Sequence, residues 1–162
     1  MITVGQVLTF LNTLASPSMK MDWDNVGLLC GDKNTPVTKI LIALDPFYHV
    51  CREAEEIGAQ LIVTHHPIIF RPLAHLTAED ATSRGIMLLC AKGISAINAH
   101  TNLDQAPGGV NDALAAALGL EDVQVLNPAG TDEMGRPWGL LRVGAVEKQP
   151  LEDFLRLVKE RL

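Results

Sequence analysis

The chain has 162 residues and a hydrophobic content of 48%, which is enough for about one domain with a sizeable core. The net charge of −6 and the lack of any run of Lys or Arg argue against a general nucleic-acid binder and against a protein of anionic membrane surfaces. No apolar stretch approaches the roughly 20 residues of a membrane span, and the first residues lack a signal-peptide pattern. We therefore expect a cytoplasmic protein with a single domain over residues 1–162.

The first part of the chain predicts a helix followed by a loop. Apolar residues at helical spacing indicate a helix over residues 3–15, where Thr3 and Gln6 can form a capping box. A polar loop then leads into a short apolar stretch, with Gly27 and Gly31 as turn points.

Three later apolar runs predict buried strands, at residues 39–44, 61–64 and 95–100. Each is followed by a predicted helix, over residues 46–57, 77–92 and 110–118. Asp45 is expected to cap the first of these helices. Glycines directly follow all three of them and are expected to end them, at Gly58, Gly93 and Gly119.

The end of the chain predicts one strand over residues 138–146 and a helix that begins at Pro150 and carries an apolar stripe to Leu162. Strands that are apolar on both faces and alternate with helices are typical of a parallel sheet covered by helices. The predicted fold class is therefore α/β, with a mainly parallel sheet flanked by helices.

Side chains of types that can bind a metal ion follow each of the three predicted strands. Asp45 follows the first strand, His65 and His66 follow the second, and His100 and Asp104 follow the third. Because the carboxyl ends of parallel strands meet at one edge of a sheet, we expect these groups to share a cleft. Imidazole nitrogens and carboxylate oxygens bind Zn, Mn, Fe or Ni, and a bridging carboxylate can hold two ions. This edge is therefore a candidate metal site.

Each of these residues also has a structural interpretation. The two adjacent histidines can face the same cleft only if the backbone turns after the strand, a break that Pro67 favours. A hydrogen-bonded structural role is the alternative for each histidine, and a local turn is the alternative for the pair His100 and Asp104. His49 and His75 are expected at the surface.

Three further features carry two interpretations each. Gly108 and Gly109 precede a helix and offer backbone amides to an anion, although a plain tight turn explains the same letters. Residues 23–25 either line the cleft or contact a neighbouring chain, or they serve in packing and turns. The three cysteines are widely spaced without a CxxC pair, which is typical of reduced thiols buried as small apolar side chains: Cys30, Cys51 and Cys90.

Three blocks of the sequence resemble the NIF-three-like family, whose members are also called GTP cyclohydrolase 1 type 2 homologues or dinuclear metal centre hexameric proteins. The blocks are WDNVGLLCGD at Trp23–Asp32, LIVTHHPIIF at Leu61–Phe70 and NAHTNLDQAPGGVNDALA at Asn98–Ala115. Their order and spacing make a chance match implausible, and the resemblance extends over essentially the whole chain.

The resemblance implies a ligand set and a cofactor. His65, His66 and Asp104 match family metal ligands, with Asp104 as the bridging carboxylate and His100 close to the metals. The implied cofactors are divalent ions, up to two per chain. Family members continue into a second half with a further His and Glu that complete the site. We therefore expect this chain to correspond to the N-terminal part of the family fold, lacking the C-terminal half.

Two functions stay open at this point, beside a third possibility, a degenerate fragment with no activity. The first is a metal-dependent hydrolase that acts on a nucleotide such as GTP or on another phosphoester. The second is a non-catalytic metal-binding scaffold within a ring-shaped oligomer, since the resemblance implies a homohexamer. Neither interpretation includes general nucleic-acid binding or a membrane.

Overall fold

The computed structural model describes residues 1–162, and its internal contacts divide the chain into two compact units, Met1–Asn102 and Leu103–Leu162. The single domain that the length predicts stays a prediction, because two compact units can belong to one domain. Each unit is described by itself below.

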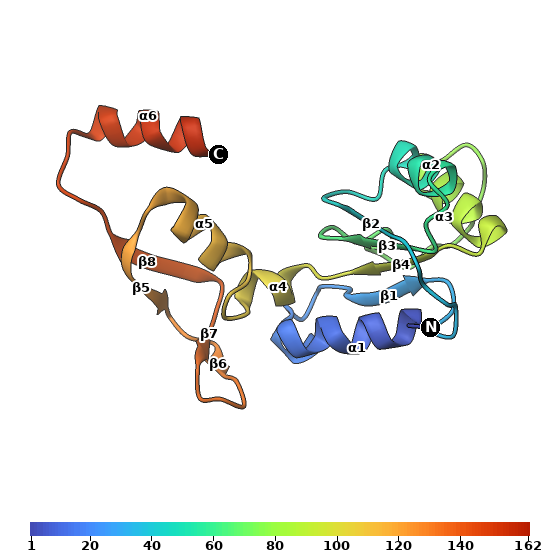
Figure 1. Ribbon diagram of the computed structural model, residues 1–162, viewed down its shortest axis with the longest axis horizontal. Coiled ribbons are helices and arrows are strands. Elements are labelled where there is room, and N and C mark those ends of the chain that lie inside the picture. Colours follow the sequence, from blue (N-terminus) through green and yellow to red (C-terminus); the bar gives the residue numbers. More distant parts are fainter. The chain divides into compact units, whose positions relative to one another are not determined.

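The first unit is built on a four-stranded sheet with the strand order β1-β4-β3-β2. Its strands are β1 (Gly27–Cys30), β2 (Ile40–Ala43), β3 (Leu61–Thr64) and β4 (Ser95–Asn98). The pairs β2–β3 and β3–β4 are parallel, and only β1 runs antiparallel to its neighbour (Figure 1). The prediction of a mainly parallel α/β sheet is confirmed.

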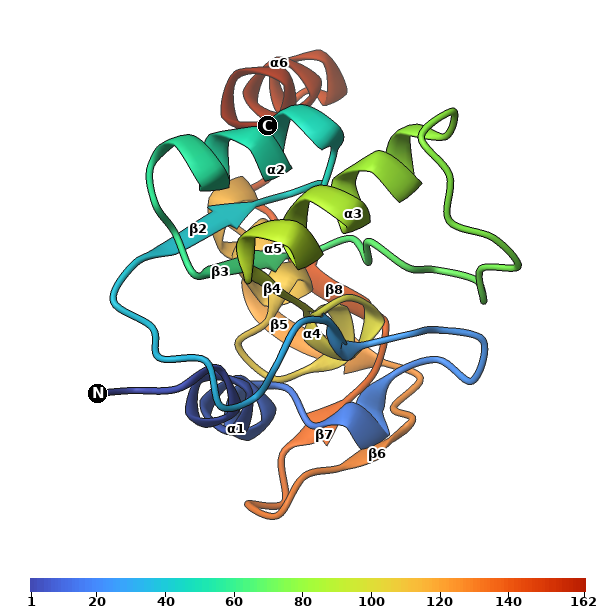
Figure 2. The same ribbon diagram turned by 90° about the vertical axis from the view of Figure 1, so that its right-hand side faces the viewer.

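Helices cover both faces of this sheet. They are α1 (Val4–Leu14), α2 (Tyr48–Glu56) and α3 (Ala81–Lys92). The 3-10 turn η1 (Pro17–Met19) follows α1, and the chain boundary between the two units falls within the short α4 (Thr101–Gln105). Helix α1 lies on one face, and α2 and α3 lie side by side on the other (Figures 1 and 2). None of the helices is both long enough and apolar enough to cross a bilayer.

Alternation along the strands explains why both faces are apolar. Leu61 and Ile97 pack toward α1 with Val4 and Val37. Ile62 and Ala96, their neighbours on the same strands, point the other way and join the larger cluster beneath α2 and α3. The other members of this cluster are Cys30, Cys51, Ala54, Ala59, Ile68, Ile86, Leu89 and Ile94. Because side chains alternate across a strand, a sheet with helices on both sides needs apolar residues at every position.

The helix ends agree with the predicted signals in all but two places. Thr3 and Gln6 form the predicted capping box of α1. Asp45 does not cap α2, which begins at Tyr48 without a side-chain cap, because the Asp45 carboxylate instead accepts a hydrogen bond from His66. Helix α3 begins four residues later than predicted, where the Asp80 side chain accepts from the Ser83 amide.

The second unit contains a helix, two small antiparallel sheets and a final helix. Its elements are α5 (Val110–Leu118), β5 (Glu121–Leu126), β6 (Gly130–Thr131), β7 (Pro137–Trp138), β8 (Leu141–Ala145) and α6 (Leu151–Arg161). Strand β5 pairs with β8, and β6 pairs with β7. The single strand predicted over residues 138–146 is therefore two strands, and β5 has no counterpart in the prediction.

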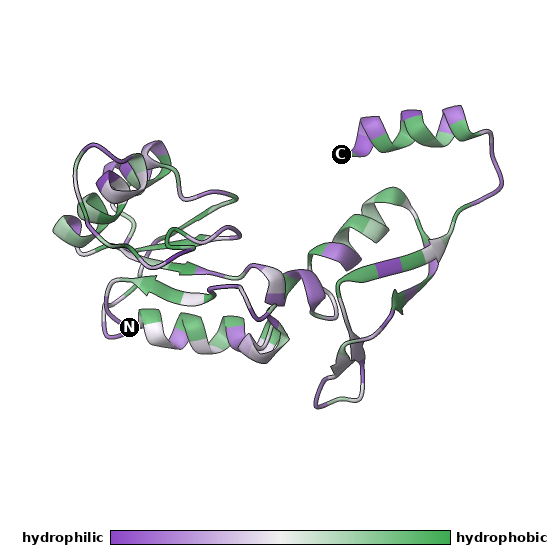
Figure 3. Cartoon of the chain, turned by 180° about the vertical axis from the view of Figure 1, so that it is seen from behind, coloured by the Kyte–Doolittle hydropathy of each residue, from purple (hydrophilic) through white to green (hydrophobic).

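The two helices of the second unit lie on the same side of the β5–β8 pair. Helix α5 packs on β8, and α6 packs on α5, where Arg161 donates to the carbonyl of Ala117 at 2.9 Å. Figure 3 shows the apolar and polar stripes of α6 as alternating green and purple. The amphipathic helix predicted to begin at Pro150 is confirmed.

The cysteines differ from the prediction at one position. All three are free thiols, and Cys30 and Cys51 are buried as predicted. Cys90 is exposed in α3. Its sulfur nevertheless lies 3.5 Å from the sulfur of Cys30.

Candidate metal centre

Three histidines meet at the carboxyl ends of two neighbouring parallel strands. His65 and His66 directly follow β3, and His100 comes two residues after β4. Their ring centroids lie 5.0 to 5.5 Å apart, and one ring nitrogen of each lies within 4.8 Å of the others. The folded chain therefore brings together His65, His66 and His100, the three histidines that follow predicted strands.

A backbone bend lets the adjacent histidines face the same side. The chain bends at His65 and His66, where the Thr64 hydroxyl donates to the His66 carbonyl at 2.7 Å. A continuing strand would direct the two rings to opposite faces of the sheet. The turn predicted ahead of Pro67 is thus present, and it is the reason that the two rings can act together.

An oxygen acceptor faces the Nδ1 atom of every ring in the cluster. His65 Nδ1 lies 3.0 Å from the carbonyl oxygen of Ala99. His66 Nδ1 lies 2.6 Å from a carboxylate oxygen of Asp45, and His100 Nδ1 lies 2.8 Å from one of Asp24. An oxygen acceptor holds the proton on Nδ1, so the lone pair of each neutral ring is on Nε2.

This arrangement fits a divalent transition metal. Imidazoles that bind such ions almost always donate their other ring nitrogen to a carboxylate or a carbonyl, which orients the ring and raises its basicity. All three histidines have a partner of this kind. Three convergent imidazoles are suitable for Zn, Mn, Fe or Ni.

Asp24 is the most deeply buried charged group of the site. Burial alone would raise the pKa of its carboxyl, but hydrogen bonds from His100, Thr101 and Asn25 bring that pKa below its usual value. One carboxylate oxygen accepts from the Asn25 amide at 2.8 Å and from the His100 ring. The other accepts from the Thr101 amide and, over a short contact, from the Thr101 hydroxyl. Asp24 is therefore a carboxylate that fixes the orientation of His100.

The other predicted site residues occupy distinct places. Asp45 lies beside His66 as its hydrogen-bond partner. Asp104 is half-buried in α4, the short helix that begins directly after His100, and its role as a ligand stays a prediction. His49 and His75 are exposed, as expected.

Sequence reasoning left the role of Asp24 open and overlooked Ala99. Asp24 and His100 are separated by 76 positions, and no spacing rule connects a loop carboxylate to a histidine at that distance. The contribution of Ala99 is its backbone carbonyl, which carries no signal in the sequence. The only available hint was the position of Asp24 within the block of residues 23–32.

A small cavity lies beside His66. It has a volume of about 150 Å³, and its lining includes Asp45, Phe47 and Tyr48 as well as His66. The His66 ring is partly open to solvent, whereas the Asp24 side chain behind His100 is fully covered. The cluster is thus accessible from one side and supported from the other.

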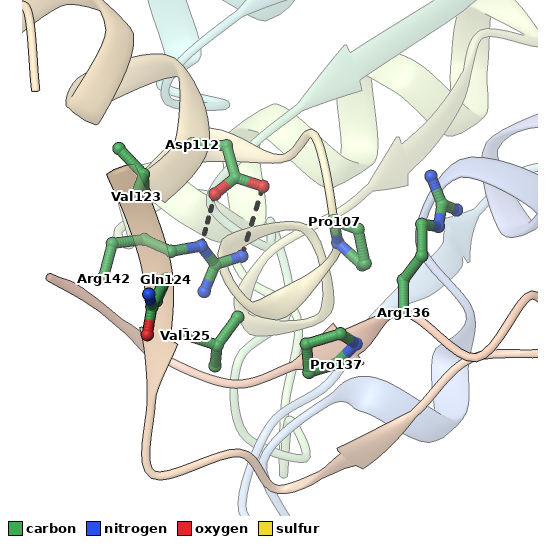
Figure 4. Close-up of a pocket in the computed structure, with 8 residues that line it drawn as sticks. All are labelled: Pro107, Asp112, Val123, Gln124, Val125, Arg136, Pro137 and Arg142. Atoms are coloured by element: carbon green, nitrogen blue, oxygen red, sulfur yellow. Dashed lines mark hydrogen bonds and ion pairs between the residues drawn. The ribbon is translucent and has the colours of Figure 1, made fainter. Parts of the chain in front are cut away.

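The second unit contains a larger cavity whose charged groups are already paired. This cavity of about 400 Å³ includes Asp112, Arg136 and Arg142 in its lining (Figure 4). The Arg142 guanidinium donates to both oxygens of Asp112 and to backbone carbonyls, including that of Gly139 at 2.6 Å. Arg136 pairs with Asp132. Both arginines are therefore already paired with acidic side chains of the same unit.

In the turn of Gly108 and Gly109 before α5, a backbone amide is likewise already paired within the protein. The Gly108 amide donates to the Asp112 carboxylate at 2.6 Å, so this amide is satisfied within the protein. A Cβ atom at Gly109 would lie only 1.9 Å from the carbonyl oxygen of Leu103. Close packing of the turn therefore explains the second glycine, and the structure favours the tight-turn interpretation over an anion site.

Comparison with known proteins places the chain among relatives that share its fold. A GTP cyclohydrolase 1 type 2 homolog of Clostridium perfringens is 34% identical over 98% of this chain, and one of Halalkalibacterium halodurans is 43% identical over 82% of it. The crystal structure of a Staphylococcus aureus hypothetical protein matches 99% of this chain at 30% identity with a TM-score of 0.90.

The match covers only part of each relative. The chain spans 60% of the Clostridium protein, 36% of the Halalkalibacterium protein and 64% of the Staphylococcus aureus chain. The model of the Duf34/NIF3 (NGG1p interacting factor 3) family, in contrast, matches residues 2–162, which is nearly the whole sequence. The chain therefore belongs to the Duf34/NIF3 family.

Proposed function

We propose that this chain holds one or two divalent ions and belongs to a hydrolase that acts on a nucleotide or another phosphoester. The proposed ligands are His65, His66 and Asp104, with His100 at the same centre. The observation that carries the proposal is the oxygen acceptor at every Nδ1 of the histidine cluster. A structural histidine needs one hydrogen bond, but three rings that converge with the same tautomer are typical of a metal site.

Each histidine of the cluster has its own hydrogen-bond acceptor, which orients its ring. The Asp45 and Asp24 carboxylates hold His66 and His100 in orientation, and the Ala99 carbonyl does the same for His65. When bound, a divalent ion supplies Lewis acidity, which polarises a substrate oxygen and makes water more acidic. The partly open His66 side leaves room for substrate to approach the cluster.

The phosphoester or nucleotide substrate is supported by the relatives. The relatives of Clostridium perfringens and Halalkalibacterium halodurans carry the name GTP cyclohydrolase 1 type 2 homolog. Ring opening of a nucleotide base and phosphoester cleavage are both hydrolytic reactions that divalent ions promote. The chain itself provides the imidazole part of such a centre.

The metal proposal is tested by elemental analysis of the purified protein and of single variants. We expect about one or two equivalents of metal in the wild type, and a loss of most of it in His66→Ala and in Asp104→Ala. His75→Ala is the matched control, because His75 is exposed and outside the cluster. Equal metal content in all four proteins would refute the assignment.

Hydrolysis is tested separately on the metal-loaded protein. GTP and bis(p-nitrophenyl) phosphate are incubated with wild type and His66→Ala, with and without added Mn²⁺ or Zn²⁺. Metal-dependent turnover of either substrate that disappears in His66→Ala supports the hydrolase. Metal binding without turnover of either one supports the second candidate below.

The second candidate is a non-catalytic metal-binding scaffold in a homo-oligomer such as a hexamer. The observation that favours it is the edge strand β2, where Ile42 is 79% exposed and its neighbours on the same face, Ile40 and Leu44, are also exposed. An open strand edge beside exposed apolar side chains favours association with another copy of the chain. Sedimentation velocity of the wild type and of Ile42→Lys tests it, since we expect the variant to dissociate.

A further inference from the structure

Two exposed aromatic side chains stand next to the histidine cluster. Trp23 is 60% exposed and Phe70 is 42% exposed, although large rings of this kind are usually buried. Their centroids lie 6.0 Å apart, and each lies 6.5 Å from the centroid of His100. Aromatic residues make up only 4% of the chain, so the placement of two exposed rings at the candidate site calls for an explanation.

The rings meet at steep angles. The planes of Trp23 and Phe70 are inclined by 69°, and those of Phe70 and His100 by 89°. We call the pair Trp23 and Phe70 the aromatic corner. A planar ring that enters such a corner stacks on one aromatic face and presents its edge to the other, and both geometries are favourable for aromatic pairs.

The aromatic corner is held in place by the surrounding backbone. Asn25 Nδ2 donates to the Ile69 carbonyl at 2.7 Å, which ties the loop that carries Trp23 to the loop that carries Phe70. The Asn25 carbonyl in turn accepts from Asn98 Nδ2 at 3.0 Å, so the joined loops are anchored to the end of β4. The Asp24 carboxylate between Trp23 and Asn25 is fixed by Thr101. The loops that carry the two rings are therefore fixed to each other and to the sheet.

We infer that the aromatic corner binds the base of a nucleotide and directs the rest of the molecule toward the histidine cluster. This inference rests on the proposed function, which it narrows: of the two substrate classes left open, it selects the nucleotide. Stacking on an exposed Trp face is tolerant of base identity, because every base has a planar π-face. His100 contacts both rings and belongs to the metal cluster, so it connects base binding with the reactive centre.

Binding is tested first without metal, which separates this inference from the proposed metal function. In a Trp138→Phe background, Trp23 is the only tryptophan, and its fluorescence is titrated with GMP in the presence of EDTA. We expect saturable quenching by GMP, and none by ribose 5-phosphate, which has the same phosphate and sugar but no base. Equal responses to the two compounds would overturn the inference.

Variants of the otherwise wild-type chain are then compared by calorimetric titration with GMP. Trp23→Leu and Phe70→Leu are each expected to weaken binding by about tenfold, as is usual when a stacking ring is lost. Phe10→Leu is the matched control, because Phe10 is also 60% exposed but lies on α1. We expect it to bind GMP as tightly as the wild type. Wild-type affinity in both corner variants, or no binding of GMP, AMP and UMP by the wild type, would refute the base site.

Metal content measured on the same samples distinguishes a failure of the proposed metal function from a failure of the base-binding inference. If GMP binding depends on Trp23 while the protein holds no metal, the proposed function fails and the aromatic corner stands. If metal is bound through His66 and no base is recognised, the inference fails and the metal centre stands.

Discussion

His100 Nδ1 donates to the carboxylate of Asp24 across 2.8 Å, and this contact joins the end of β4 to a loop 76 positions earlier in the chain. The Asp24 side chain is fully covered, and hydrogen bonds hold its pKa below the usual range against the effect of burial. A carboxylate that stays ionised behind a histidine fixes both the ring tautomer and its direction. The loop of residues 23–25 therefore takes part in the site rather than merely packing beside it.

Asp24→Asn is expected to weaken metal binding by roughly 10- to 100-fold, since His100 then loses the charged partner that orients its ring. The affinity is measured by competition with a chromogenic chelator. Asp22→Asn provides the control, because Asp22 lies two positions away and is exposed. If both substitutions weaken binding equally, the effect is one of net charge and the positioning role of Asp24 is wrong.

Metal binding is expected to stabilise the folded chain. A ligand that binds only the folded state, at a concentration about 100 times its Kd, adds about 2.7 kcal/mol to the free energy of unfolding. Zn²⁺ or Mn²⁺ should therefore raise the Tm of the wild type, and EDTA should reverse the rise. His66→Ala should lose the response and His75→Ala should keep it. An unchanged Tm in the wild type at saturating metal would contradict the coupling.

The structure also shows which features a single sequence can reveal. Strands β2 and β3 and helix α1 were predictable because apolar residues repeat at the period of a buried strand or a helix face, and a capping box marked where α1 begins. The histidines could be placed together because the carboxyl ends of parallel strands meet at one edge. These signals are local, or they follow from the fold class.

Other features depend on tertiary contacts that leave no local trace. Strand β5 begins with two acidic residues, contains Asp122 at a φ of +48° and has an irregular register with β8, so its apolar alternation is weak. The division into two units lies within the short α4, where no Gly- or Pro-rich linker marks it. Asp45 is of a residue type that often caps helices, but its carboxylate accepts from the His66 ring and not from a backbone amide of α2. Only the folded chain decides between these two donors.

Gly31→Ala is expected to destabilise the first unit by at least about 2 kcal/mol, because two penalties act at the same position. The φ of Gly31 is +103°, and an added Cβ would lie 2.2 Å from the Ser95 hydroxyl oxygen. Gly58→Ala is the matched control, with a φ of +67° and open space around the added atom. That control substitution should lower the free energy of unfolding by only about 1 to 2 kcal/mol. Urea unfolding at neutral pH measures both values, and equal costs would show that the contact with Ser95 is unimportant.

The three thiols are expected to differ in reactivity. Burial, followed by the hydrogen bond with Cys90, raises the pKa of Cys30 to about 12, and burial also raises the pKa of Cys51. Alkylation requires the thiolate, so at pH 8 iodoacetamide should modify the exposed Cys90 and leave the other two unmodified in the folded protein. Mass spectrometry of the intact protein should show one adduct, and none after Cys90→Ser. Rapid modification of Cys30 would contradict its buried state.

The Asp112–Arg142 pair is expected to make the second unit less stable in acid. The pKa of Asp112 is lowered: burial opposes the shift, but hydrogen bonds from Arg142 and from the Gly108 amide outweigh it. A carboxyl whose folded pKa lies below its unfolded value of about 3.9 contributes stability above that value and loses it as the pH falls through the folded pKa. The pair should therefore stabilise the protein fully above about pH 5 and weaken progressively below pH 4.

Urea unfolding as a function of pH, compared between the wild type and Asp112→Asn, isolates this contribution. The wild type should lose more stability than the variant between pH 5 and pH 3, while both respond alike to all other carboxyl groups. At neutral pH, Asp112→Ala should cost on the order of 3 to 5 kcal/mol, because it leaves the Arg142 side chain, only 4% exposed, without its counter-charge. The double variant Asp112→Leu with Arg142→Met should recover most of that loss, since replacing both partners removes the uncompensated charge. If the double variant is as unstable as Asp112→Ala, the cost comes from lost packing around Arg142 and not from its unpaired charge.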